Sequence, residues 1–139
     1  PAGGKVLQVI NATYTTNTYT NSTSFSDTGL TASITLSSTS SKVLVIVTQA
    51  GIWRDSSNTQ GSAIKLLRDS TVIAVMADYT SAVNNQSISA VTANISYLDS
   101  PSSTSALAFK TQYNAVNGAW VYVQKGNNRS SITLLEIAG

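Results

Sequence analysis

One stretch constrains the fold of this chain more than any other, the unbroken apolar run Val43 to Val47 inside the segment Ser41–Thr48. Four of its five residues are β-branched, and the run is too short for a lone core helix, so it predicts a β-strand. Because neighbouring residues of a strand point to opposite faces, such a run is typical of a strand covered on both sides. One face must pack on the core. The other must pack on a second layer or on another copy of the chain, and we favour another copy.

The flanking sequence predicts an all-β fold, because apolar residues alternate with Ser and Thr and no helical period extends beyond a turn. Turn signals separate the alternating segments at Asp27-Thr28-Gly29, Arg68–Thr71, Asp99–Ser102, Asn117-Gly118 and Lys125–Asn128. The expected strands are Lys5–Tyr14, Leu30–Leu36, Ser41–Arg54, Ala63–Leu67, Val72–Met76, Ile88–Leu98, Leu107–Tyr113, Trp120–Val123 and Ile132–Ala138. Thr15–Ser24 is expected to be a surface loop or a weak edge strand. Eight or nine strands with short turns favour a two-sheet antiparallel β-sandwich of jelly-roll type.

Composition excludes several classes of protein. The 139 residues suit one domain, with residues 1–4 expected to be a linker to an upstream segment and 5–139 the sandwich. Charged residues are only 10%, against roughly 25% in an ordinary soluble domain, and the net charge of +2 is too small for a nucleic-acid footprint. The chain lacks both His and Cys, so we expect no metal and no other cofactor. No apolar run reaches membrane-spanning length, so we expect no membrane insertion.

The six acids favour structural roles over catalysis. Four of the five Asp residues lie in turn-like contexts, where Asp caps backbone N–H groups, and no two carboxylates are brought together locally. Glu136 differs because alternation places it on one face with Ile132 and Leu134. A buried carboxylate needs a partner. We therefore expect an ion pair or hydrogen bond with an Arg or Lys, within the chain or across a subunit boundary; a catalytic carboxylate is the alternative.

Aromatic side chains beside polar groups are the candidates for ligand binding. Trp53-Arg54-Asp55 ends the central strand and enters a polar loop, an arrangement in which a ring can cover the apolar face of a sugar while polar groups bind its hydroxyls. The alternative for Trp53 is a core or interface plug. The candidate ligand-binding residues are Trp53, Arg54, Asp55, Asn58, Tyr19 and Tyr79. The residues expected to be structural or to lie at an interface are Glu136, Trp120, Val45 and Val47.

Four segments carry a resemblance to a known group of proteins. Ser37–Val45, Lys65–Ile73, Tyr97–Pro101 and Ser131–Gly139 resemble, in the same order, segments of C-terminal domains of phage tail fibres and virion appendages, especially those of phages of marine bacteria. The resemblance spans about Lys5 to Gly139. It implies a trimeric β-sandwich knob, similar to tumour-necrosis-factor-type heads, at the end of a fibre. It implies no particular binding residues, because such heads differ in their exposed loops.

The residues themselves also favour subunit contacts. Val43–Val47, Val72–Ala77 and Leu134-Leu135 carry apolar residues on both strand faces, more than one sandwich core of this size requires. Extra apolar faces on a charge-poor domain indicate burial between subunits, and closed three-fold packing would cover them.

Three functions remain in competition, and an enzyme ranks last. The first is a trimeric receptor-binding head of a phage virion, joined to other virion proteins through its N-terminus and contacting a host-surface glycan through its loops. The second is a purely structural virion protein, such as a capsid decoration or head-fibre knob, without a specific ligand. The third is a secreted bacterial carbohydrate-binding module.

Overall fold

The computed structural model describes residues 4–55, 61–78 and 88–139, the last range without the side chains of 88–90. These ranges contain ten strands and one short 3₁₀ turn, η1 (Lys125–Asn127). The strands are β1 (Val6–Tyr14), β2 (Thr18–Thr20), β3 (Ser26–Thr35), β4 (Lys42–Arg54), β5 (Ser62–Arg68), β6 (Thr71–Ala77), β7 (Ile88–Asp99), β8 (Ala106–Ala115), β9 (Val121–Val123) and β10 (Ser130–Ile137). No helix in the described ranges is long and apolar enough to cross a membrane.

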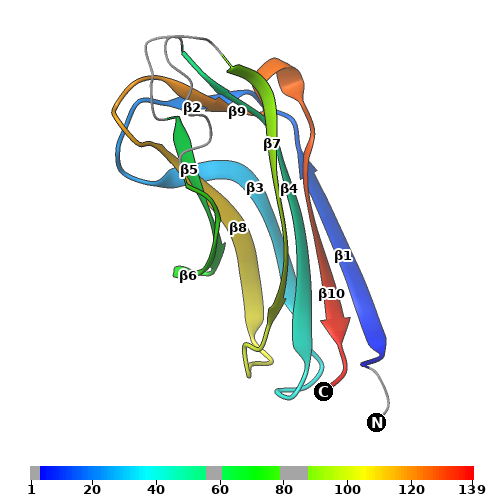
Figure 1. The fold of residues 1–139 in the computed structure, drawn as a ribbon. Coiled ribbons are helices and arrows are strands. Elements are labelled where there is room, and N and C mark those ends of the chain that lie inside the picture. The colour runs from blue at the N-terminus through cyan, green and yellow to red at the C-terminus, as the bar shows by residue number, and fades with distance from the viewer. Residues whose placement is uncertain (1–3, 56–60, 79–87) are drawn as a thin grey trace.

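The strands form two antiparallel sheets that face each other, as Figure 1 shows, and the predicted all-β sandwich is confirmed at this level. The six-stranded sheet has the order β1-β10-β4-β9-β2, with β7 on the other side of β4, and the four-stranded sheet has the order β3-β8-β5-β6. The long strand β4 is the organising element of the larger sheet, because β10, β7 and β9 all pair with it. The predicted hairpin of β5 and β6 turns at Arg68–Thr71 as expected.

Strand alternation sorts the residues of the larger sheet into inward and outward rows. The register places Ile10, Leu134, Val45 and Tyr97 side by side across β1, β10, β4 and β7. This row packs against the core cluster of the sandwich. The adjacent residue on each of these strands faces outward. These residues form the row Val9, Leu135, Leu44 and Leu98. Val9 and Leu98 in that row are half or more exposed, at 57% and 50%.

The central run is therefore covered on one face by its own chain. Val43, Val45 and Val47 are fully buried between the sheets, whereas Ile46 on the other face is 41% exposed. Val45 and Val47, which were expected to be structural or to lie at an interface, are structural, because both point into the core of a single chain. The outward residues of the run Val43 to Val47 are Leu44 and Ile46.

A belt of buried polar side chains divides the core into two hydrophobic clusters. Thr111 lies between Phe109 and Tyr113 on β8, and each of these aromatic residues belongs to a different cluster. The Thr111 hydroxyl donates to Gln49 Oε1 at 2.7 Å, and Gln49 Nε2 donates to Ser130 Oγ at 3.0 Å. Ser130 Oγ also accepts from Gln124 Nε2 and from the backbone N–H of Ala50. The belt joins the two sheets and gives these buried donors acceptors, whose absence would be costly.

The turn predicted at Asp27-Thr28-Gly29 is wrong, because these three residues belong to β3, which continues to Thr35. The pairing of β3 with β8 shifts register between Asp27 and Thr31, which is a bulge. Gly29 has φ +93°, and the ring of Tyr14 occupies the space that a Cβ atom would need. A glycine bulge bends a strand without ending it, so the same signal is compatible with both structures.

The two ends of the described chain lie together, far from β2 and β9 (Figure 1). The backbone N–H of Ala138 donates to Lys5 O at 2.8 Å. A segment joined to either end would therefore leave the sandwich opposite β2 and β9.

Candidate functional site: an exposed aromatic platform

Four aromatic side chains gather where β2, β9 and the end of β4 meet. The register places Tyr19 of β2 opposite Tyr122 of β9, and Tyr122 opposite Trp53 of β4. Because directly opposite residues share one face of a sheet, the three rings form a row across three strands. The Tyr19 and Tyr122 ring centroids are 5.6 Å apart, and those of Tyr122 and Trp53 are 4.8 Å apart. Both separations fall in the range of favourable aromatic contacts.

Trp120 completes the cluster from the turn that precedes β9. Its ring packs edge-on against Tyr19, with the centroids 5.6 Å apart. Tyr19 is 58% exposed and Trp120 42% exposed, whereas Trp53 and Tyr122 are half-buried. We call Tyr19, Trp53, Trp120 and Tyr122, together with Lys125, the aromatic platform.

Lys125 brings a positive charge onto the rings. Its Nζ lies 4.1 Å from the centroid of Tyr122 and 4.9 Å from that of Trp53, which is cation–π geometry. The position of Lys125 depends on a close backbone contact. Gln124 N donates to Ala50 O at 3.0 Å, and a Cβ atom at Gly51 would lie 2.6 Å from the backbone nitrogen of Lys125. Gly51, at φ +61°, is thus required for this approach.

The platform has the chemistry of a shallow stacking site. Two exposed rings offer apolar faces, and an ammonium group beside them offers hydrogen-bond donors and charge. Tyr122 and Lys125 were missed as site residues in the sequence. A signal for Tyr122 existed, because an aromatic residue between Val121 and Val123 must face outward if both valines are buried, as they are.

The structure brings some predicted ligand-binding residues together and separates others. Tyr19 and Trp53 both belong to the platform. Arg54 does not, because it points to the other face of β4 and is only 1% exposed, so its assignment as a surface contact is corrected. Asp55 is half-buried, and its backbone N–H donates to Trp120 O at 3.0 Å. Asn58 and Tyr79 lie outside the described residues.

Trp120, which was expected to be structural or to lie at an interface, is exposed and does not belong to the core. An interface role for it remains a prediction.

Glu136 is buried, as its strand alternation predicts, but its partners are neutral. Glu136 Oε1 accepts from the backbone N–H and the hydroxyl of Ser37 at 2.8 and 2.7 Å. Glu136 Oε2 accepts from Gln8 Nε2 at 2.6 Å. These hydrogen bonds from Ser37 and Gln8 lower the pKa of Glu136 to about 2. The expected Arg or Lys partner is thus replaced by amide and hydroxyl donors of the same chain, which tie β1 and the β3–β4 loop to β10.

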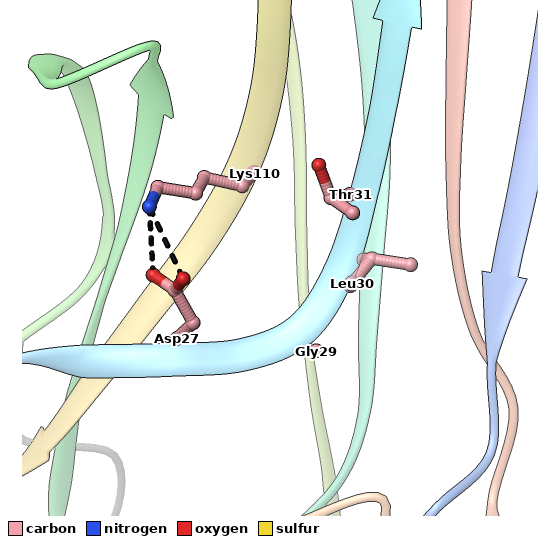
Figure 2. A pocket seen from close by; sticks show the side chains of 5 residues that line it. All are labelled: Asp27, Gly29, Leu30, Thr31 and Lys110. Atoms are coloured by element: carbon pink, nitrogen blue, oxygen red, sulfur yellow. Dashed lines mark hydrogen bonds and ion pairs between the residues drawn. The ribbon is translucent and has the colours of Figure 1, made fainter.

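A small pocket at the β3 bulge is a weaker candidate. It encloses about 100 Å³, and Figure 2 shows that Asp27 and Lys110 meet at its wall. Lys110 Nζ lies 2.9 Å from Asp27 Oδ1, which also accepts from Gln112 Nε2 at 2.8 Å. The hydrogen bond from Gln112, with help from Lys110, lowers the pKa of Asp27. Ligand pockets usually enclose roughly 300–1,000 Å³. Because the charges already satisfy each other, we assign the pocket a structural role.

The other acids and the comparisons add no competing site. Asp69, in the β5–β6 turn, accepts from the backbone N–H of Ala108 on β8, which is the capping role that its turn context predicts. Asp99 instead forms an ion pair with Arg68 at 2.6 Å. Within the described residues, no group of acids could hold a metal ion. Comparison with known protein families and with curated proteins returns no match for this chain.

Proposed function

We propose that this chain is a non-enzymatic glycan-binding domain that serves as the trimeric receptor-binding head of a phage fibre. The observation that carries the proposal is the aromatic platform, with Tyr19 and Trp120 exposed on a charge-poor β-sandwich. The C–H face of a pyranose ring is apolar and flat. An exposed aromatic ring matches that face, while polar groups at the ring edge bind the hydroxyls.

The strand order supports a jelly roll as the finer description of the sandwich. When the short strands β2 and β9 are set aside, the two sheets have the orders β1-β10-β4-β7 and β3-β8-β5-β6. In each sheet, strands from the first and the second half of the chain alternate. That alternation is what two Greek keys wound into one sandwich produce.

The outward face of the larger sheet supports the trimer. Next to the apolar row Val9, Leu135, Leu44 and Leu98, the register places the row Asn11, Thr133, Ile46 and Ser96. Neither row contains a charged residue. Beyond these rows, the same face carries a charge at Lys42. Solvated sheet faces usually carry charges, so two uncharged, partly apolar rows are suited to burial against another copy.

Position supports the assignment to a fibre head. The platform lies at the β2–β9 end of the sandwich, away from the two chain ends (Figure 1). A fibre joined at the chain ends would therefore present the platform outward. Single stacking contacts bind weakly, so attachment would depend on three copies acting together on a dense glycan surface.

The test is binding of the purified chain to a glycan array and to polysaccharides extracted from candidate host cells. Trp120→Ala and Tyr19→Ala should each reduce binding at least severalfold, because each removes an exposed stacking face. The matched control is Val75→Ala, which removes an exposed apolar side chain from β6 in the other sheet. Equal binding by all three folded variants would overturn the platform as the site.

A purely structural virion knob is the second candidate, and the outward apolar rows favour it equally. Its distinguishing result is a stable trimer that binds no glycan or host cell. A secreted carbohydrate-binding module would share the platform chemistry, and the gene upstream of this segment distinguishes it from a fibre.

A further inference from the structure

We infer that the ligand of the aromatic platform is an acidic saccharide, one that carries a carboxylate on its sugar ring, as hexuronic acids do. The inference rests on the proposed function and specifies its ligand class. The observation that supports it is a difference within the platform: two of its rings are exposed, and the other two contact a lysine ammonium group.

The exposed rings and the half-buried rings of the platform differ in what they can bind. Tyr19 and Trp120 are 58% and 42% exposed, so their faces can accept a sugar ring. Tyr122 and Trp53 are half-buried, and Lys125 Nζ already lies over both. The planes of Tyr19 and Trp120 are 63° apart, so a sugar would stack on one of these two rings and contact the edge of the other. Tyr122 and Trp53 position the ammonium group beside it.

The Lys125 ammonium group has donors to offer. Within the described part of the chain, the ion pairs join Arg68 to Asp99 and Lys110 to Asp27, and Lys125 belongs to neither. A ring face attracts the charge but accepts no strong hydrogen bond, so the three N–H donors of the ammonium remain to be matched. A carboxylate oxygen is the partner that matches both the charge and the donors.

The spacing suits a carboxylate on the stacked ring itself. Tyr19 and Tyr122 are adjacent, with centroids 5.6 Å apart, and Lys125 Nζ is 4.1 Å from the Tyr122 centroid. The ammonium is thus one aromatic ring away from the exposed stacking face. An exocyclic carboxylate extends from the edge of a pyranose, so one orientation of a sugar stacked on Tyr19 directs it toward Lys125.

A nucleic acid would also combine stacking with negative charge. It requires a track of several basic residues along the phosphate backbone. The platform includes one lysine, and the net charge of the chain is only +2. The saccharide is therefore the favoured ligand, and single-stranded DNA becomes an outcome of the test.

The experiment compares polygalacturonate and alginate with fully methyl-esterified polygalacturonate, which has the same backbone without the charge. Affinity electrophoresis at 20 and 300 mM NaCl measures retention of the wild-type chain and its variants. We expect the acidic polymers to retain the wild type more strongly than the ester does, with the difference reduced at high salt. Lys125→Gln should weaken retention by the acidic polymers about two- to fivefold per site, the size of one exposed ion pair, and leave retention by the ester unchanged. Lys125→Arg should restore the preference.

The matched control is Lys5→Gln, which removes one exposed lysine beside the chain ends, opposite the platform, and so changes the net charge equally. An equal loss in both Gln variants, or no preference for the acidic polymers in the wild type, would overturn the inference. The proposed function would survive that result if Trp120→Ala still abolished binding to a neutral glycan. Oligothymidylate bound more tightly than the acidic polymers, and lost with Lys125→Gln, would assign the platform to single-stranded nucleic acid instead.

Discussion

Glu136 shows how one buried charge is stabilised without an ion pair. Its two oxygens accept three hydrogen bonds from Ser37 and Gln8. The amide of Gln8 is fixed in turn, because its Nε2 also donates to Thr35 O at 2.7 Å. A neutral glutamine at position 136 would present an NH₂ group to one of these donors. Gln8 cannot rotate to accept from it without turning its oxygen toward the Thr35 carbonyl.

The depressed pKa of Glu136 makes the stability of the protein depend on pH. Its pKa falls from an ordinary value of 4.5 to about 2 on folding, so the folded state binds its proton less tightly than the unfolded state does. The stabilisation is therefore complete above pH 4.5 and is lost as the pH falls toward 2. We expect Glu136→Gln to melt at a lower temperature than the wild type at pH 6, and the difference to shrink toward pH 2. A difference in melting temperature that is constant from pH 2 to 6 would contradict this account.

Ser130 is a second residue at which one side-chain atom, the hydroxyl oxygen, stabilises the fold. Its hydroxyl oxygen accepts from Gln49, Gln124 and the Ala50 backbone. Ser130→Ala leaves these buried donors without an acceptor, so we expect a loss of about 1–3 kcal/mol in the free energy of unfolding. Urea denaturation measures it, with Ser33→Ala on the exposed face of β3 as the control. A loss no larger than that of the control would show that water or a rearranged amide replaces the hydroxyl.

The position of the short turn η1 depends on one residue of a neighbouring strand, Gly51 of β4. It follows β9 and carries Lys125 onto the rings, and its backbone lies against Gly51 of β4. Gly51 lies within the register shift between Gln49 and Ile52 of the β4–β7 pairing, and there the partner of β4 on its other edge changes from β10 to β9. The platform therefore depends on an irregularity within the longest strand.

We expect Gly51→Ala to disturb η1 and the platform together. The new Cβ atom would lie 2.6 Å from Lys125 N and 2.9 Å from Gln124 C, and backbone atoms cannot rotate away. With the left-handed φ added, a loss of about 1–3 kcal/mol is expected, together with a change in tryptophan fluorescence. Gly118→Ala is a matched control, because Gly118 also has a positive φ but its nearest non-neighbouring atom is 3.8 Å away. Equal effects of the two substitutions would mean that φ alone matters at Gly51.

For the whole molecule, the outward rows of the larger sheet are the surface on which the proposed trimer depends. Ile46 lies near their centre, between Thr133 of β10 and Ser96 of β7, and is 41% exposed. If three copies close on this face, a charge at this position would be buried without a partner. The sandwich core would be untouched, because Ile46 points away from it.

We therefore expect Ile46→Asp to convert the proposed trimer to folded monomers at micromolar concentration, as measured by light scattering and native mass spectrometry. The control Val75→Asp places the same charge on an exposed apolar position of the other sheet and should remain trimeric. A monomeric wild type would refute the trimer. Dissociation by Val75→Asp alone would move the interface to the β5–β6 side.

Local pattern in the sequence was sufficient for much of this fold. The alternation in Leu30–Leu36 and Leu107–Tyr113, the continuous run in β4 and the β5–β6 hairpin are all present as predicted. Successive side chains of a strand point to opposite faces, so the face on which each residue lies can be inferred from its position in the sequence. The sequence by itself therefore determined the strands, their buried faces and the burial of Glu136.

Only the tertiary structure decided which strands meet and what their meeting creates. Tyr19 and Tyr122 are about a hundred residues apart and became neighbours through the β2–β9 register. The same holds for Gln8 and Glu136, and for the belt that joins Gln49 to Ser130. Pairing also overrode a local signal at Gly29, since a continuous ladder with β8 tolerates a bulge where the sequence alone indicates a turn. Register is a property of two strands at once, so no local pattern contains it.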